Sequence, residues 1–180
     1  MTPPLLHGLP PIIDAGARIL ILGSFPSVAS LEAGHYYAHS RNQFWRVLAQ
    51  VLERPLLSMD YEDVQAAVRQ AGFAVWDVYG RCRRQGSLDT AIRDAQANDF
   101  RRLKALAPSL TRVCFNGTTA GKFAPQLAAL GYETRLLPST SPAYTLSFER
   151  KLALWKDALQ PTLAAENFPG GLSTSCGDTG

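Results

Sequence analysis

The chain has 180 residues, 46% of them hydrophobic, which is enough for one globular domain with a buried core. Its net charge of +3 permits a polyanionic partner without requiring one. No apolar run approaches the roughly 20 residues that cross a bilayer, and the first residues, MTPPLLHGLPPIID, lack the features of a signal peptide, so we expect a cytoplasmic protein with no membrane partner. The cysteines Cys82, Cys114 and Cys176 form no CxxC pair and no metal-ligand spacing, so we expect no disulfide framework and no metal site.

The first half of the chain alternates apolar strand patterns with helical patterns. The run ARILILG (17–23) predicts a strand buried on both faces. Apolar residues at helical spacing predict a helix over 40–54, begun by a capping box of Ser40 and Gln43. A second helix is expected over 59–72 with Asp60 as its cap, followed by a strand over 73–79.

The second half repeats this alternation after a polar stretch. Asn98 is expected to cap a short helix that ends at Pro108. The remaining predicted elements are a strand at 112–117, a helix at 118–131, a strand at 132–139 and a closing helix at 147–160. We expect one domain over residues 1–163 and a disordered Gly- and Ser-rich tail over 164–180.

This alternation predicts a three-layer α/β/α sandwich with a central four-stranded parallel sheet. In such sheets, ligands bind beyond the carboxyl ends of the strands. The four strands run into GSFPS, WDV, FNG and LPSTSPAY, which supply small and polar residues. Four such loops at one edge of a sheet indicate a binding site.

The loop after the first strand carries the strongest local signal. Gly23 permits a tight turn and a close approach to a ligand, and Pro26 stiffens the turn. Tyr36 and Tyr37 offer flat rings to a flat ligand, and Asn42 could point its amide into the site. The alternative is that the tyrosines pack on the sheet and Asn42 only caps a helix.

Several common kinds of catalytic site are absent from the sequence. It contains neither the phosphate-binding GxxxxGK[ST] nor GxGxxG, and no GxSxG nucleophile elbow. An ester hydrolase that uses Ser24 or Ser27 with His35 stays open, although no spacing favours it. His7 and His39 are expected at the surface or in caps.

Two further segments could contact phosphates. Ser139 and Ser141 could donate hydrogen bonds to phosphate oxygens, or could simply form a turn before the last helix. Arg81, Arg83 and Arg84 form a basic cluster that we interpret as a solvated loop, with contact to a phosphate backbone as the alternative.

Together these segments resemble the uracil-DNA glycosylase superfamily, and most closely its hypoxanthine-DNA glycosylase branch, also called DNA-deoxyinosine glycosylases. The resemblance runs in order over ILGSFPS, YYAHSRNQFW, GFAVWDVYGRCRRQGSLD, NDF, FNG and LPSTSPA, and covers most of residues 18–160. It implies a uracil-DNA glycosylase-like fold and a monofunctional DNA glycosylase that removes deaminated bases, hypoxanthine first and then uracil or xanthine. It also implies a DNA partner, a monomer and no cofactor.

The resemblance also assigns roles to residues. It implies that Asn42 is the catalytic residue and that Tyr37 stacks on the extruded base. Phe25 stands where other members of the superfamily have a catalytic Asp or Asn. Substrate-binding roles fall to Gly23, Ser24, Phe25, Pro26, Tyr37, Phe44 and Asn116. DNA-binding roles fall to Ser27, Pro138, Ser139, Thr140, Ser141 and Tyr144.

The chain departs from the branch at two positions of the LPSTSPAY segment. Leu137 replaces the His that opens this motif in the classical uracil enzymes, and Tyr144 stands where the branch commonly has Asn. Asp77 and Asn116, at strand ends, are expected to contact the base or support the pocket. A lyase lysine is not expected, because Lys104, Lys122, Lys151 and Lys156 fall on helices away from the site.

The implied chemistry suits these residue types. A base must leave the duplex to be reached, and stacking on an aromatic ring returns roughly 1–3 kcal/mol of that cost. An amide such as Asn42 cannot accept a proton at neutral pH, so its implied role is to orient the attacking water. The alternative function is a protein with this fold that binds damaged or single-stranded DNA without cleaving it.

Overall fold

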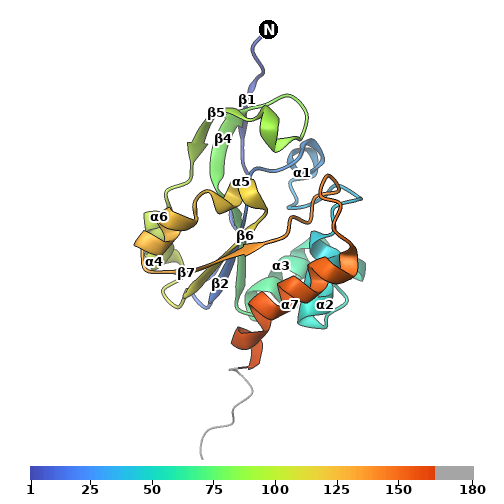
Figure 1. Ribbon diagram of the computed structural model, residues 1–180, viewed down its shortest axis with the longest axis vertical. Helices are drawn as coiled ribbons and strands as arrows, with labels where there is room; N and C mark the ends of the chain where they lie inside the picture. The colour runs from blue at the N-terminus through green and yellow to red at the C-terminus, as the bar shows by residue number, and fades with distance from the viewer. Residues whose placement is uncertain (165–180) are drawn as a thin grey trace, which may run out of the picture.

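A computed structural model describes residues 1–164, and its centre is the predicted four-stranded parallel sheet (Figure 1). The strand order is β3-β2-β6-β7, and each neighbouring pair is parallel. The strands are β2 (Ile19–Gly23), β3 (Phe73–Asp77), β6 (Arg112–Asn116) and β7 (Glu133–Leu137). The predicted tail over 164–180 lies, apart from its first residue, outside the described residues.

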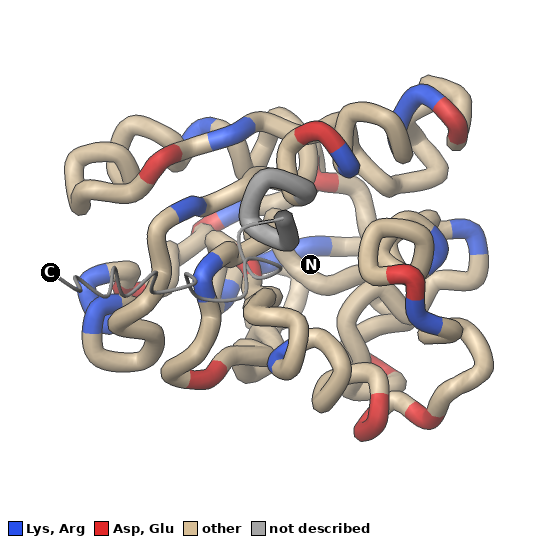
Figure 2. The backbone as a smooth tube through the Cα atoms, turned by 90° about the horizontal axis from the view of Figure 1, so that it is seen from below, with Lys and Arg blue, Asp and Glu red and all other residues tan. Residues whose placement is uncertain are grey.

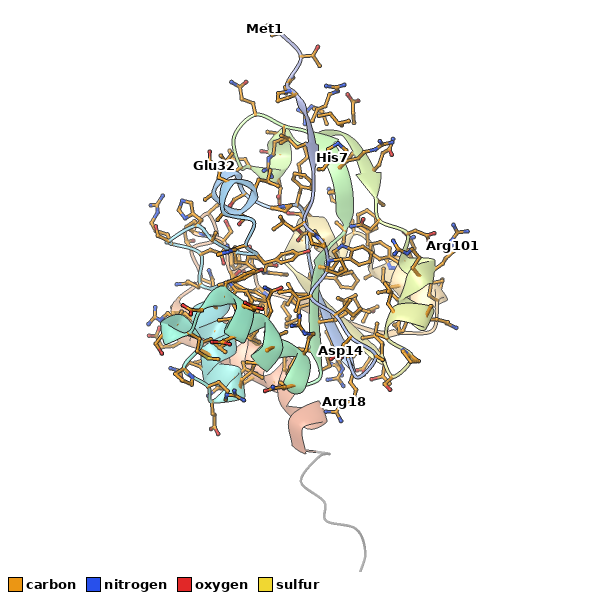
Figure 3. The ribbon with its side chains drawn as sticks, turned by 180° about the vertical axis from the view of Figure 1, so that it is seen from behind. Met1, His7, Asp14, Arg18, Glu32 and Arg101 are labelled. Atoms are coloured by element: carbon orange, nitrogen blue, oxygen red, sulfur yellow. The ribbon has the colours of Figure 1, made fainter. Side chains whose placement is uncertain are left out.

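The register of the strands brings four predicted loops to one edge. Gly23 pairs with Asp77, and Asn116 pairs with Leu137, so these strand ends lie at the same carboxyl edge. Asp14 and Arg18, just before β2, lie at the opposite end of the molecule from His7 (Figure 3). The loops that leave the strands therefore point toward the half of the molecule that holds the N-terminal strand.

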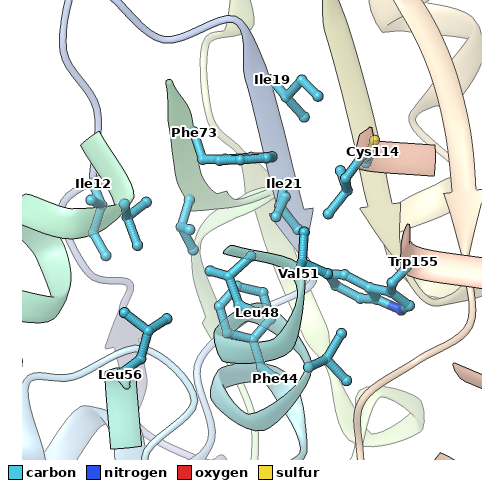
Figure 4. Packing of buried hydrophobic residues seen from close by; sticks show 14 of the residues in the cluster. Ile12, Ile19, Ile21, Phe44, Leu48, Val51, Leu56, Phe73, Cys114 and Trp155 are labelled. Atoms are coloured by element: carbon cyan, nitrogen blue, oxygen red, sulfur yellow. The ribbon is translucent and has the colours of Figure 1, made fainter. Parts of the chain in front are cut away.

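One face of the sheet is covered by α2 (Phe44–Leu52), α3 (Tyr61–Gln70) and α7 (Phe148–Ala164). Alternate strand residues such as Ile19, Ile21 and Phe73 join a buried cluster with Phe44 and Trp155 (Figure 4). The short helix η1 (Leu56–Ser58) adds Leu56 to this cluster. Burial of this apolar surface fixes the three helices against the sheet.

The opposite face packs against shorter helices. Leu20 and Leu22, which alternate with Ile19 and Ile21, join a second buried cluster on this face. The helical elements here are η3 (Phe100–Arg102), α4 (Leu103–Leu106), α5 (Thr118–Gly121) and α6 (Ala124–Ala129). The single helix predicted over 118–131 is wrong. In a continuous helix Pro125 could not donate an N–H and its ring would clash with the carbonyl of Gly121, and α5 ends at this glycine.

A second, antiparallel sheet was not predicted. It has the order β1-β4-β5, from β1 (Leu5–His7), β4 (Tyr79–Arg83) and β5 (Arg93–Ala97), and lies beyond the carboxyl edge of the main sheet (Figure 1). The strand β5 is exposed throughout and polar, so it shows no alternation of apolar residues. Its connection to β4 contains η2 (Asp89–Ala91), while α1 (Val28–Ala33) lies in the loop after β2.

Two predicted helix caps are wrong. Helix α2 begins at Phe44, and Gln43 caps it without a side-chain hydrogen bond, so no capping box forms. The side chain of Asn42 instead accepts from the Phe44 N–H at 2.9 Å. Asp99, not Asn98, caps η3, because the Asp99 side chain accepts from the Arg101 N–H.

Two properties of the whole chain bear on its partners. Basic and acidic residues are interspersed along the backbone of the described residues (Figure 2). Among the described helices, none has both the length and the apolar composition that crossing a bilayer requires.

Candidate active site

A cavity of about 610 Å³ opens at the carboxyl edge of the main sheet. Its walls come from the loops after β2, β6 and β7 and from the β4–β5 connection. Twelve of the predicted site residues line it, namely Gly23, Ser24, Phe25, Pro26, Ser27, Tyr37, Asn42, Asn116, Ser139, Thr140, Ser141 and Tyr144. Phe44 and Pro138 do not line the cavity, and Phe44 lies behind Tyr37, on which it stacks.

The floor of the cavity depends on the absence of a side chain at Gly23. A β-carbon at this position would lie 2.6 Å from both Asp77 Oδ1 and the Tyr37 hydroxyl. Both side chains can approach the β2 backbone only because residue 23 is glycine. Glycine therefore brings a carboxyl group and a phenol to the same small region of the cavity.

Tyr37 has an unusual backbone conformation and a buried support. Its φ of 53° lies in the left-handed region, which a residue with a side chain rarely adopts and which concentrates at functional sites. Its ring stacks on Phe44, with centroids 3.9 Å apart and planes at 14°. Phe44 is fully buried, so it supports Tyr37 from behind and cannot itself contact a ligand.

Asn42, just before the Gln43 cap, bonds the first N–H of α2 through its side chain and also lines the cavity. Its Oδ1 accepts the Phe44 N–H, which matches the alternative that the residue only caps a helix. Its Nδ2 makes no hydrogen bond to any described residue, and Asn42 lines the cavity. The cap thus orients the amide and leaves its two N–H donors and one oxygen lone pair available.

Asn116 uses its amide within the protein. Its Nδ2 donates to the Tyr37 hydroxyl at 3.2 Å and to Thr140 Oγ1 at 2.9 Å, and its Oδ1 accepts the Thr140 N–H at 3.0 Å. Both amide hydrogens are therefore occupied. Asn116 was expected either to contact the base or to support the pocket. Its hydrogen bonds join the loops after β2, β6 and β7, which favours the supporting role.

Asp77 brings a buried carboxyl group to the cavity. Its residue is 5% exposed, and its Oδ2 has no hydrogen-bond partner among the described residues. Burial and, after it, the Asp89 carboxylate raise the pKa of Asp77 to about 7, against the opposing effect of the Arg84 guanidinium. Asn98 Nδ2 holds the backbone of Asp77 through its carbonyl at 2.8 Å.

The β4–β5 connection forms a wall that sequence reasoning missed. Ser87, Leu88, Asp89 and Thr90 line the cavity, and Asp89 Oδ1 accepts the Ser24 hydroxyl at 2.6 Å. No apolar periodicity marks these residues. Ser87, Leu88 and Asp89 end the GRCRRQGSLD segment of the resemblance, which was the one signal that could have drawn attention to them.

The same connection corrects our interpretation of the arginine cluster as a solvated loop. Arg84 is 3% exposed, and its Nη2 donates to the Pro26 carbonyl at 2.5 Å. Arg81 and Arg83 lie on β4, where they contact Gln96 and Asp94 of β5. The cluster therefore builds the second sheet and its contact with the loop after β2.

Helix α7 holds the LPSTSPAY segment from behind. Trp155 Nε1 donates to the Pro138 carbonyl at 3.0 Å, and the buried Lys151 donates to the Tyr144 carbonyl at 2.8 Å. Lys151 does not line the cavity, but it contacts the backbone of Tyr144, which does. Burial lowers the pKa of the Lys151 ammonium group.

The described residues show no serine-hydrolase arrangement. Ser24 donates to Asp89, and Ser27 donates to Ser30, so neither serine contacts a histidine. His35 stacks on Tyr61 outside the cavity, whereas His39 lines the cavity and accepts the Arg41 N–H. Within residues 1–164, no three His, Cys, Asp or Glu side chains are grouped to hold a metal ion.

Comparison with known proteins agrees with this geometry. The family model described as "Uracil DNA glycosylase superfamily" matches residues 10–161. A hypoxanthine DNA glycosylase of Methanosarcina barkeri is 39% identical over 154 residues, which are 86% of this chain and 98% of the relative. The Methanosarcina acetivorans protein of the same name is 38% identical over 150 residues, 83% of this chain and 95% of its own.

A solved structure is similar over nearly the same length. It is the solution NMR structure of a Methanosarcina acetivorans protein described as a candidate uracil DNA glycosylase. Its TM-score is 0.81 and its identity 35%, and the match covers 89% of this chain and 99% of that one.

Proposed function

The chain belongs to the uracil DNA glycosylase superfamily, and from this premise we propose that it hydrolyses the N-glycosidic bond of hypoxanthine in DNA. It is a DNA glycosylase, and the two relatives named for hypoxanthine support this base as its first substrate. Removal of a deaminated base is the first step of base-excision repair. Uracil and xanthine are further substrates to compare with hypoxanthine.

The shape of the cavity supports a flipped-out base as its ligand. A base that has left the duplex needs a flat surface to stack on and donors at its edge. Tyr37 offers the ring, held by Phe44 on its other face, and Asn42 offers N–H groups that have no partner among residues 1–164. The segment from Ser139 to Tyr144 lines the same cavity, which supports our proposal that it contacts the DNA strand beside the flipped nucleotide.

Asn42 is the residue that we propose to act on the attacking water. Its cap to Phe44 fixes the direction of the amide, and its free lone pair can accept a hydrogen bond from a water molecule. A carboxamide does not take up the proton, so it acts by holding the water against C1′ of the deoxyribose. The single observation that carries this role is the oriented, otherwise unpaired amide at the cavity wall.

Asn42→Ala and Asn42→Ser variants separate this role from helix capping. Serine also caps helix starts but is too short to hold a water in the cavity, whereas alanine loses both functions. We expect Asn42→Ala to lose about 1 kcal/mol of stability and Asn42→Ser to lose much less. We expect both variants to lose about 100-fold or more in excision rate.

The measurement is base release from duplexes that carry one hypoxanthine, uracil or xanthine, followed by alkali and a denaturing gel. Single-turnover rates with enzyme in excess report the chemical step. If Asn42→Ser excised hypoxanthine at the wild-type rate, Asn42 would be a cap only. A wild type that bound the duplex and released no base would instead support a non-catalytic DNA-binding protein.

We further propose that the protein acts as a monomer in the cytoplasm and without a cofactor. The hydrolysis needs only water, amide and carboxyl groups, all of which the cavity can supply. An open cavity mouth suits an enzyme that must enclose one nucleotide while a duplex lies across it. Sedimentation at micromolar concentration tests the monomer.

A further inference from the structure

We propose that Asp77 is the general acid of this enzyme and transfers a proton to the departing hypoxanthine. This inference rests on the proposed function, since it names the group that activates the leaving base of that reaction. The loss of a purine leaves negative charge on the base, and a proton supplied in the transition state removes that charge.

The position of Asp77 carries the argument. Asp77 is 5% exposed and lines the base cavity. Its Oδ2 has no hydrogen-bond partner in the described part of the chain. An unpaired carboxyl oxygen in a buried site costs free energy unless the bound ligand completes its hydrogen bond. A purine ring nitrogen or the O6 atom would be such a partner for a protonated carboxyl.

The groups around Asp77 favour its protonated form. The Asp89 carboxylate on η2 raises the pKa of Asp77 electrostatically. From the loop before α2 come the phenols of Tyr36 and Tyr37, whose pKa values burial raises, so they carry no charge at physiological pH. Arg84, just after β4, is the only cation that bears on Asp77 in the described chain, and it makes no ion pair with it within 4 Å. Burial and Asp89 outweigh Arg84, so the pKa of Asp77 rises to about 7.

The proposed step balances as follows. The C1′–N9 bond breaks and its electron pair stays on the base, while the Asp77 proton passes to the base. A water held by Asn42 adds its oxygen to C1′ and releases one proton. The Asp77 carboxylate takes up that proton, directly or from solvent, so the enzyme returns to its starting state. The products are neutral hypoxanthine and an abasic deoxyribose.

The direction of the pH dependence distinguishes an acid from a base. If the protonated form is active, the single-turnover rate of the wild type is constant below pH 6 and falls as pH rises above about 7. If the ionised form acted as a general base on water, the rate would rise over the same interval.

We would measure single-turnover release of hypoxanthine from pH 5 to 9 for wild type, Asp77→Asn and the control Asp63→Asn. Asp63 is an exposed residue on α3, away from the cavity. We expect Asp77→Asn to be about 100-fold slower at pH 6 and independent of pH, because an amide can donate a hydrogen bond but cannot transfer its proton. We expect Asp63→Asn to follow the wild type.

A second measurement separates chemistry from binding and from misfolding. A duplex with 2′-fluoro-2′-deoxyinosine resists cleavage, so its Kd reports binding alone. We expect Asp77→Asn to bind this duplex within about threefold of wild type, since the amide keeps a donor toward the base. A large loss of binding that accounts for the rate would overturn the role as an acid.

The two levels of the proposal fail in different ways. If wild type releases no hypoxanthine at any pH, the proposed function fails first and the role of Asp77 with it. If wild type releases hypoxanthine but its rate rises with pH, or if Asp77→Asn keeps the wild-type rate, only the general acid is refuted.

Discussion

A single missing β-carbon at Gly23 allows the Asp77 carboxyl and the Tyr37 phenol to lie in the same part of the cavity floor. Tyr37 adopts a positive φ to reach that position, and Phe44 and Asn116 hold its ring and its hydroxyl. These local constraints leave Asp77 Oδ2 without a hydrogen-bond partner among the described residues. A bound base can then supply what the folded protein lacks.

Burial of Asp77 predicts a specific pH dependence of stability. Its pKa is raised from 3.8 in the unfolded chain to about 7 in the folded protein, so the unfolded chain releases its proton first. The stability of the fold therefore falls as pH rises from about 4 to about 7, by at most about 4 kcal/mol from this group. Asp77→Asn carries no titrating group and escapes this loss.

Thermal melts of both proteins at pH 4 and pH 8 check this expectation. The melting temperature of Asp77→Asn relative to wild type should be higher at pH 8 than at pH 4. An equal difference at the two pH values would mean that Asp77 titrates in the folded protein as it does in the unfolded chain.

At the scale of elements, the β4–β5 connection completes a site that four parallel strands begin. It is tied to the loop after β2 by Ser24 with Asp89, by the Val28 N–H with Ser87, and by Arg84 with the Pro26 carbonyl. These ties hold Leu88 at the cavity although the residue is 63% exposed. An exposed leucine at the mouth of a base pocket can contact the bases that unstack beside the flipped nucleotide.

Leu88→Ser tests this contact. We expect the variant to bind a hypoxanthine-containing duplex about threefold to tenfold more weakly, because the unstacked neighbours lose an apolar contact of about 1 kcal/mol. Leu57→Ser is the matched control, since Leu57 is 68% exposed on η1 and does not line the cavity. Equal affinities of both variants and wild type would mean that Leu88 does not contact DNA.

At the scale of the whole molecule, one sheet separates two buried clusters that share its strands. Alternate residues of β2 enter opposite clusters, so neither cluster can form without the strand that also belongs to the other. The site lies at the carboxyl edge of the sheet, where the loops after its strands meet the β4–β5 connection. Its geometry therefore depends on the entire domain and not on one motif.

This architecture predicts a single unfolding transition. Trp155 lies in one cluster and Trp76 in the other, so their fluorescence reports on the two sides of the sheet. Urea unfolding followed by fluorescence in wild type and in Trp76→Phe should coincide with unfolding followed by far-UV circular dichroism. Separate midpoints would show two units that unfold independently.

The local pattern of the chain was sufficient for the central sheet and for most of the cavity lining. Buried parallel strands require continuous apolar runs, and each run ends at the residues that form the site, so β2, β3, β6 and β7 are visible in the sequence. The motifs after these strands lie within a few residues of the strand ends. Their convergence at one edge follows from parallel pairing alone.

The remaining features depend on contacts between residues distant in sequence. The second sheet is polar and exposed, so its strands are stabilised by pairing between β1, β4 and β5 rather than by an apolar pattern. The free carboxyl of Asp77, the burial of Arg84 and the support of Tyr144 by Lys151 likewise arise from packing. Side-chain periodicity records which residues face a core, but the charge state and the hydrogen-bond partners of a polar group depend on what the folded chain places around it.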